Sequence, residues 1–116
     1  MPDGELAWAS FDMPIRRKVF NRCEAREDGL IHPTQKPVAL YRWLLTNYAK
    51  PGQSILDTHM GSQSSRIAAW DLGFDYCGYE LDADYFKAGC ERFERYKAQP
   101  KLFAPEPEQT TQEILF

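Results

Sequence analysis

Two short stretches of this sequence carry side chains that could hold a nucleotide-containing ligand. In the first, Ile55 and Leu56 predict a short buried strand, Asp57 stands at its carboxyl end, and Gly61 with its small neighbours opens the next helix. The first turn of a helix has unpaired N–H groups and a positive dipole end, and a strand-end carboxylate can accept hydrogen bonds from a ligand. Taken alone this pattern is a weak indication, because Asp57 could simply cap the next element.

A second acid strengthens the indication. Residues 76–82 (YCGYELD) form another short apolar run, and it ends in Glu80. Glu80 follows the Gly61 turn by about 20 residues, the separation expected of a ribose-binding acid in a doubly wound sheet. The alternative is a solvated strand end. A further motif, HPTQKP at residues 32–37, stands before a predicted helix and could by itself be only the loop that leads into it.

Strands and helices in alternation must position these residues. Pro37 suits the first position of a helix that stops at residues 50–52 (KPG), and residues 54–56 follow as a strand. Residues 62–72 predict a helix that ends at Gly73. Residues 75–80 predict a second buried strand, and Asp82 is expected to cap a third helix. The sequence thus predicts an α/β fold with a mostly parallel sheet flanked by helices. The expected inward-facing residues are Val38, Tyr41, Leu44, Leu45 and Tyr48 in the first helix, Ile67, Ala68 and Leu72 in the second, and Phe86, Gly89, Cys90 and Phe93 in the third.

The two ends of the chain have a different character from this core. Residues 6–11 (LAWASF) and 18–23 are mixed apolar runs separated by a turn signal, which predicts two strands, or a strand and an extended arm. After residue 99, three prolines break every period, which predicts a flexible tail. We therefore divide the chain into an amino-terminal strand and loop segment (1–31), a cofactor-binding α/β core (32–98) and a tail (99–116).

Length and cysteine content limit the classes of protein that the chain can represent. Its 116 residues allow one domain at most. Cys23, Cys77 and Cys90 are scattered and show no CxxC spacing, so they indicate reduced thiols rather than disulfides or a metal site. Neither a membrane-spanning apolar run nor a signal-peptide pattern occurs, so the expected location is the cytoplasm.

Basic residues are concentrated in the amino-terminal part of the chain. Residues 1–50 hold eight Lys or Arg and six Asp or Glu, whereas residues 51–116 hold six and eleven. Any contact with DNA phosphates is expected in the first part. The candidates are Arg16, Arg17, Lys18, Arg22 and Arg26, and the alternative is an ordinary solvated face.

Together, HPTQKP, the strand with ILDxxxGS, the second strand ending in Glu80, and Asp84-Tyr85 at the start of a helix resemble a family. The chain is similar, over roughly residues 5–103, to the carboxyl-terminal portion of DNA amino-methyltransferases of the permuted class, in the small phage or prophage form. The resemblance implies a Rossmann-like methyltransferase fold, partial here, S-adenosylmethionine as cofactor, methylation of adenine N6 or cytosine N4 in DNA, and restriction-modification as a setting.

The resemblance also implies roles for particular residues. Residues 57–62 would lie along the amino acid part of S-adenosylmethionine, Glu80 would accept hydrogen bonds from the ribose, and Leu81 would pack on the adenine. Lys36, with Thr34 and Gln35, would border the methionine carboxylate. For His59 an ordinary structural role is favoured. The full set of expected cofactor-binding residues is His32, Thr34, Gln35, Lys36, Asp57, Thr58, His59, Met60, Gly61, Ser62, Glu80 and Leu81.

Two departures from the family pattern bear on activity. Gln63 stands where the family continues with Gly, and if that position needs a positive φ, Gln costs about 1–2 kcal/mol and obstructs the pocket. The family also uses an Asp, Asn or Ser followed by Pro-Pro and an aromatic residue to hold the flipped base, and no Pro-Pro pair occurs in this sequence. We therefore expect no catalytic residue here, and a chain that is inactive alone.

The lack of that tetrapeptide leaves other hypotheses open. A half sheet would expose apolar edges and faces, which predicts self-association or pairing with a missing amino-terminal half. Residues 99–103 and 112–116 both fit Q-x-x-L-F, which resembles sliding-clamp ligands, with Gln112, Leu115 and Phe116 the better candidates. The alternative function is a non-catalytic remnant or interaction module. A domain for another nucleotide is disfavoured because GxGxxG is absent.

Overall fold

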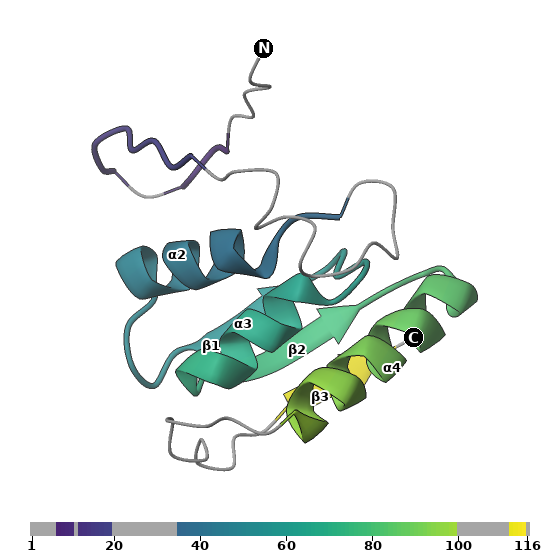
Figure 1. Ribbon diagram of the computed structural model, residues 1–116. Helices are drawn as coiled ribbons and strands as arrows, with labels where there is room; N and C mark the ends of the chain where they lie inside the picture. Colours follow the sequence, from purple (N-terminus) through teal and green to yellow (C-terminus); the bar gives the residue numbers. More distant parts are fainter. Residues whose placement is uncertain (1–6, 11, 20–34, 100–111, 116) are drawn as a thin grey trace.

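The computed structural model describes residues 7–10, 12–19 and 35–99, and the backbone of residues 112–115. Three helices and three strands alternate along this part of the chain (Figure 1). In chain order they are α2 (Val38–Tyr48), β1 (Ser54–Asp57), α3 (Ser64–Leu72), β2 (Asp75–Tyr79), α4 (Ala83–Ala98) and β3 (Gln112–Leu115). The predicted α/β alternation of residues 38–98 is confirmed.

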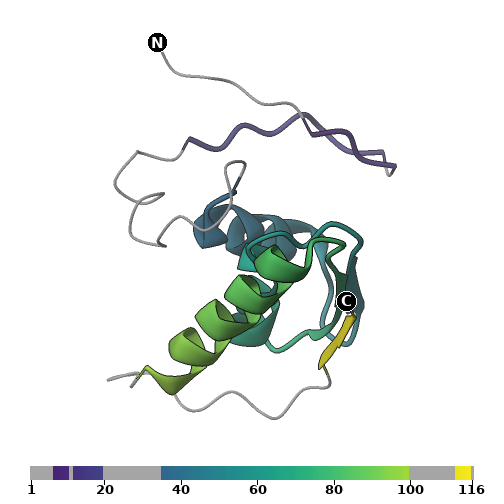
Figure 2. The ribbon, with the colours of Figure 1, turned by 90° about the vertical axis from the view of Figure 1, so that its right-hand side faces the viewer.

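The strands form one parallel sheet in the order β1-β2-β3. Successive parallel connections that run in the same direction along a sheet place their helices on one face, because such crossovers are right-handed. Figure 2 shows the sheet nearly edge-on, with α2, α3 and α4 all on the same side. We expected helices flanking the sheet, but in the described part of the chain they cover only one face.

Two connected apolar clusters form the core. Between the helices, Val38 and Ile67 pack with Phe93, and the rings of Trp70 and Phe93 meet edge to face at 5.7 Å. A second cluster, which joins the helices to the sheet, consists of Met60, Ala69, Phe74 and Tyr76. Burying such side chains stabilises the fold by roughly 1.5–3 kcal/mol each.

The helix ends follow local signals in the sequence. Gly73 adopts φ 77° at the end of α3, and the Asp82 carboxylate accepts hydrogen bonds from the N–H groups of Asp84 and Tyr85 at the start of α4, so both predicted caps are confirmed. Three details were wrong. The strand predicted to be buried at Ile55 and Leu56 leaves Leu56 64% exposed, because Leu56 points away from the helices. Pro37 is the residue before the first helical residue, with extended backbone. Leu72 is 40% exposed instead of buried, because it lies in the last turn where Gly73 redirects the chain.

The two end segments differ from the predictions. Ala7–Ser10 and the described residues 12–19 form neither strand nor helix, so the predicted strands are wrong for these positions. The remaining residues of those two runs lie outside the described part. β3 lies within the segment predicted as a flexible tail, and its backbone pairs with β2 from Tyr76 to Tyr79. Long-range pairing of this kind leaves no local signal in a four-residue stretch.

Among the residues that the structure describes, no helix is long and apolar enough to cross a membrane. The same residues contain no cluster of three or more His, Cys, Asp or Glu side chains that could hold a metal ion. Cys77 and Cys90 are free thiols, and Cys23 lies outside the described part.

Candidate functional site

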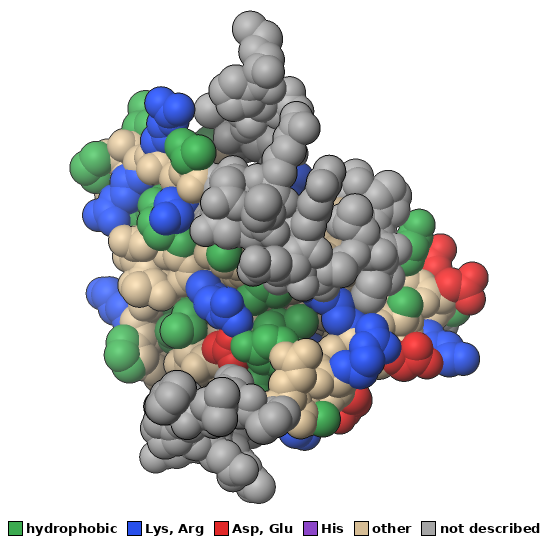
Figure 3. All heavy atoms as spheres, in the orientation of Figure 1, with side chains coloured by type: hydrophobic (Ala, Val, Ile, Leu, Met, Phe, Trp, Pro, Cys, Tyr) green, Lys and Arg blue, Asp and Glu red, His purple; other side chains and the backbone are tan. Residues whose placement is uncertain are grey.

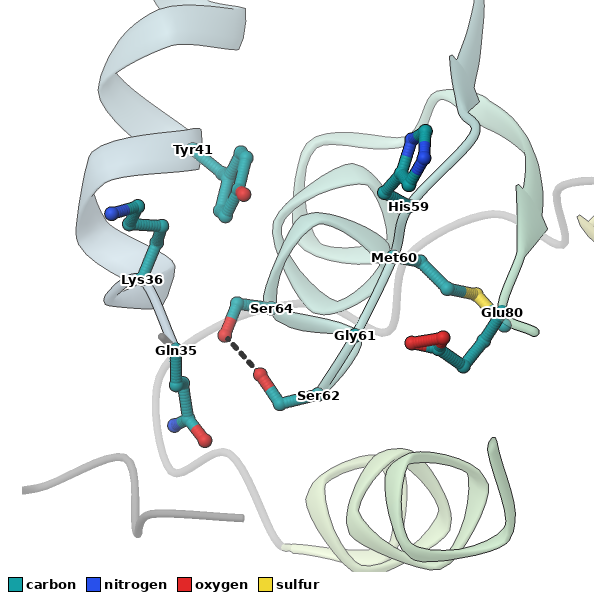
Figure 4. Close-up of a pocket in the computed structure, with 9 residues that line it drawn as sticks. All are labelled: Gln35, Lys36, Tyr41, His59, Met60, Gly61, Ser62, Ser64 and Glu80. Atoms are coloured by element: carbon teal, nitrogen blue, oxygen red, sulfur yellow. Dashed lines mark hydrogen bonds between the residues drawn. The ribbon is translucent and has the colours of Figure 1, made fainter. Parts of the chain in front are cut away.

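A pocket of about 360 Å³ opens where three separate parts of the chain meet. Its walls come from the segment before α2 and from α2 itself, from the turn between β1 and α3, and from the residue after β2 (Figure 4). The lining residues are Gln35, Lys36, Tyr41, His59, Met60, Gly61, Ser62, Ser64 and Glu80. Pockets of this size accommodate small ligands and cofactors.

The parallel pairing of β1 and β2 brings the turn and Glu80 together. Asp57 lies opposite Gly78 in this parallel pair, so the carboxyl ends of both strands lie side by side. The Met60 N–H then donates to the Tyr79 carbonyl at 2.9 Å, which fastens the turn to the end of β2. Glu80 directly follows Tyr79, so this backbone hydrogen bond also holds Glu80 beside the turn.

Asp57 is held by groups of the chain itself. One of its carboxylate oxygens accepts the His59 N–H at 3.0 Å, and the other accepts the Ser65 hydroxyl at 2.6 Å. Ser65 lies 2.8 Å from the Tyr76 hydroxyl. The one hydrogen of the Ser65 hydroxyl goes to Asp57, so the Tyr76 hydroxyl donates to Ser65. Burial raises the pKa of Tyr76 well above its ordinary value, which keeps this hydroxyl protonated. This chain of hydrogen bonds stabilises the turn, and Asp57 does not line the pocket.

Gln63 has the positive φ that its position was suspected to require, 68°. Its side chain is fully buried and is directed toward α4, where its amide nitrogen lies 3.3 Å from the Phe86 carbonyl and 3.3 Å from the Cys90 sulfur. Its amide oxygen accepts from Arg66 at 3.0 Å. Gln63 does not line the pocket, so the expected obstruction is absent from this structure.

The pocket combines opposite charges with hydrogen-bonding groups. Lys36 stands on one wall and Glu80 on another, and the amino end of α3 contributes a partial positive charge between them (Figure 4). In this view the Lys36 ammonium points away from Ser62 and Ser64. Lys36 would therefore have to change rotamer to contact an anion beside the serines. Such an arrangement suits a ligand with an anionic end and a group that donates hydrogen bonds to a carboxylate.

Seven of the twelve predicted cofactor residues meet in this pocket. They are Gln35, Lys36, His59, Met60, Gly61, Ser62 and Glu80. Asp57, Thr58 and Leu81 do not line it, and the Leu81 side chain is 94% exposed. His32 and Thr34 lie outside the described residues. The roles of all twelve residues in cofactor binding stay predictions.

Sequence reasoning missed two lining residues, Tyr41 and Ser64. Ser64 belongs to the same small-residue turn as Ser62, so the motif could have included it. Tyr41 was assigned only to the apolar face of its helix. Tyr41 lies in the first turn of α2, five residues after Lys36, and only the packing of α2 on α3 brings it to the pocket.

Of the candidate DNA-contacting residues, Arg16 lies at the carboxyl end of α2. Arg16 donates to the Asn47 side chain at 2.8 Å and its guanidinium carbon lies 5.6 Å from the centre of the Tyr48 ring. Arg17 and Lys18 are exposed, and Arg22 and Arg26 are outside the described residues. On the face drawn in Figure 3, Asp and Glu side chains are visible at the right and near the centre, and the Lys and Arg side chains at the upper left are interspersed with hydrophobic side chains.

Residues 11–91 match a protein-family model described as DNA methylase. Because the match covers more than half of the chain, the chain belongs to this family of DNA methylases. Two proteins of Escherichia coli (strain K12) are similar to it. "Putative methylase YubD" is 39% identical over 61 residues, and "DNA adenine methyltransferase YhdJ" is 35% identical over 63 residues.

These similarities cover only a minor part of the relatives. The matched stretches are 53% and 54% of this chain, but they are 27% and 21% of the two relatives. No solved structure matches the chain. Family membership is therefore established by sequence, and the activity of a whole methylase does not follow for this chain from the match alone.

Proposed function

We propose that this chain is the S-adenosylmethionine-binding part of a DNA amino-methyltransferase that acts on adenine N6 or cytosine N4. The observation that carries the proposal is the pocket, where Lys36, the Gly61–Ser62 turn and Glu80 converge from three separate stretches. Membership in the DNA methylase family supports it independently. The matched stretches are a small part of both relatives, and the assignment of this chain to the carboxyl-terminal portion of a permuted enzyme is part of the proposal. The phage form and a restriction-modification setting stay predictions.

The lining residues fit the chemistry of S-adenosylmethionine. Glu80 directly follows β2 and would accept hydrogen bonds from the two ribose hydroxyls, as strand-end acids do in doubly wound folds. Ser62, Ser64 and the amino end of α3 would donate to the methionine carboxylate, with Lys36 supplying the charge. Leu81 would pack against the adenine from its exposed position. When bound, the cofactor supplies an electrophilic methyl group for direct transfer to an amine.

This chain would hold the cofactor without completing the reaction. An exocyclic amine needs acceptor groups for its hydrogens and an aromatic ring for the flipped base, and the Pro-Pro tetrapeptide that provides them in the family does not occur in the 116 residues. We infer that base binding and methyl transfer require another segment or chain. DNA would be the substrate of that complete enzyme.

The same absence favours a second candidate, a non-catalytic remnant that binds a partner. For a sliding clamp, the candidate residues Gln112 and Leu115 lie in β3, whose backbone pairs with β2. A peptide in a clamp groove is extended and separate from its own domain, so binding would require β3 to leave the sheet. This hypothesis predicts that a clamp competes with β3 pairing.

Calorimetric titration of the full chain with S-adenosylmethionine and S-adenosylhomocysteine tests the first proposal. We expect both to bind, and Glu80→Ala to weaken both at least about 10-fold through the loss of hydrogen bonds to a charged acceptor. Glu91→Ala, an exposed acid on α4 outside the pocket, is the matched control and should bind as the wild type does. Lack of binding by the wild type, or equal affinity in Glu80→Ala, would contradict the proposal.

A further inference from the structure

A buried arginine on α4 reaches the turn that lines the pocket. Arg92 is only 7% exposed, and one of its guanidinium nitrogens lies 3.0 Å from the Ser62 carbonyl oxygen and 2.8 Å from the Ser64 hydroxyl oxygen. The same nitrogen lies 3.4 Å from the Ser62 hydroxyl. Ser62 and Ser64 line the pocket, whereas Arg92 stands behind them.

The direction of these hydrogen bonds is decided by chemistry. A guanidinium has donors and no acceptor, so the Ser62 carbonyl and the Ser64 hydroxyl, at 3.0 and 2.8 Å, accept the two hydrogens of this nitrogen, and the Ser62 hydroxyl at 3.4 Å shares one of them at most. Each serine therefore keeps its own hydroxyl hydrogen for another acceptor. The two hydroxyl oxygens lie 3.4 Å apart, and one can donate to the other (Figure 4). That contact uses one of the two hydrogens, and the other is left to donate.

We propose that Arg92 is a positioning residue that holds the Ser62 backbone and the Ser64 hydroxyl so that this serine pair presents a hydrogen-bond donor to the pocket, and so selects the carboxylate end of the ligand at this wall. The inference rests on the proposed function and on its orientation of the ligand, with the carboxylate at the serines and the ribose at Glu80. Ser62 and Ser64 would touch the ligand, and Arg92 would act only through them.

The electrostatics of the turn favour the same orientation. The buried positive charge of Arg92 and the amino end of α3 both lie beside the serines, whereas Glu80 places a negative charge on a different wall. A ligand carboxylate is therefore attracted to the serines and repelled by Glu80. Hydrogen bonds from polarised donors to a carboxylate are also roughly twice as strong as neutral ones.

A merely structural Arg92 would connect α4 to the turn and affect every ligand alike. The two roles are separated by comparing S-adenosylhomocysteine with 5′-methylthioadenosine, which shares its nucleoside but has no carboxylate. Affinities for both are measured by calorimetry on the full-length wild type, Arg92→Met and Arg92→Lys. Arg95→Met, an exposed arginine on the same helix, serves as the matched control.

For Arg92→Met we expect affinity for S-adenosylhomocysteine to fall about 10-fold or more, and affinity for 5′-methylthioadenosine to change by less than about twofold. Arg92→Lys should recover part of the loss, because its ammonium retains donors, and Arg95→Met should bind both ligands normally. If Arg92→Met fails to fold, Arg92→Lys decides the question, because its longer contact to the Ser64 hydroxyl should weaken binding of S-adenosylhomocysteine more than binding of 5′-methylthioadenosine.

Two negative results have different meanings. A wild type that binds both ligands, together with variants that weaken both equally or neither, would overturn the role of Arg92 and leave the proposed function standing. A wild type that binds neither ligand would overturn the proposed function and this inference with it.

Discussion

The Gln63 side chain occupies space that is open because Gly89 has no side chain. A Cβ placed on Gly89 of α4 would lie 2.8 Å from both the Cγ and the amide nitrogen of Gln63. Gln63 occupies a left-handed position on the turn and is fully buried. The turn that forms the pocket wall is therefore packed directly against α4 through this pair.

Gly89→Ala should lower the free energy of unfolding by about 1–3 kcal/mol, because the new methyl overpacks against Gln63. In a Gln63→Ala background the same change should cost less, since the space is then free. A double-mutant cycle by chemical denaturation measures this difference. An equal cost of Gly89→Ala in both backgrounds would show that the two residues are not coupled.

Gln63→Gly should destabilise the protein despite relieving the left-handed backbone. The relief amounts to about 1 kcal/mol, whereas a hydrogen bond to charged Arg66 is worth about 1.5–3 kcal/mol and the buried side chain leaves a cavity. We expect a net loss of about 1–2 kcal/mol by denaturation. Because Gln63 does not line the pocket, calorimetry should show cofactor affinity within about twofold of the wild type. A clear gain in affinity would mean that Gln63 does obstruct the pocket.

Alkaline pH should loosen the contact among the three helices. Tyr96 of α4 and Arg42 of α2 both hydrogen-bond to Asp71 of α3, and Tyr96 also lies 2.8 Å from Arg42. Burial, together with the bond to Asp71, raises the pKa of Tyr96 to about 12. A tyrosine pKa that is raised by folding stabilises the protein fully below its ordinary value near 10, and this contribution is lost as the pH rises toward 12.

Unfolding followed from pH 9 to pH 12 should therefore show a fall in stability that is smaller in Tyr96→Phe, which has no proton to lose. Tyr85→Phe, a tyrosine of the same helix outside this contact, is the control and should follow the wild type. Identical pH profiles for the wild type and Tyr96→Phe would contradict this account.

In the part of the chain that the structure describes, the helices cover one face of the sheet, and the other face should make the chain self-associate. Leu56 is 64% exposed and Tyr79 is 41% exposed, and both lie on the face of the sheet opposite the helices. Apolar side chains on an open sheet favour association, and β1 is an edge strand. Sedimentation velocity at micromolar concentration should show dimers or larger species in the wild type and a shift toward monomer in Leu56→Lys. A monodisperse wild-type monomer would contradict this prediction.

Much of the core could be predicted from the sequence because its signals are local. Gly73 and Asp82 mark helix ends through their own backbone and side-chain preferences, and the short apolar runs before Asp57 and Glu80 became β1 and β2. Glu80 was placed at the pocket because strand ends in a parallel sheet meet at one edge.

The rest depends on contacts between distant elements. Tyr41 enters the pocket wall, and Arg92 stands behind the turn, only because α2 and α4 pack beside α3. Gln63 has the expected backbone, but the direction of its side chain is decided by the space at Gly89. β3 forms by pairing with β2, which is distant in sequence, and no local sequence pattern predicts such pairing.

The most direct test of the account is to locate the S-adenosylhomocysteine site by backbone amide chemical shifts in the full chain. We predict that titration shifts the amides of Lys36, Gly61, Ser62 and Glu80, and leaves those of Asp71 and Tyr96, at the other end of α3 and on α4, unchanged. A shift pattern centred on Leu56 and Tyr79, or no shifts at a ligand concentration in the millimolar range, would contradict the claim that this pocket holds the cofactor.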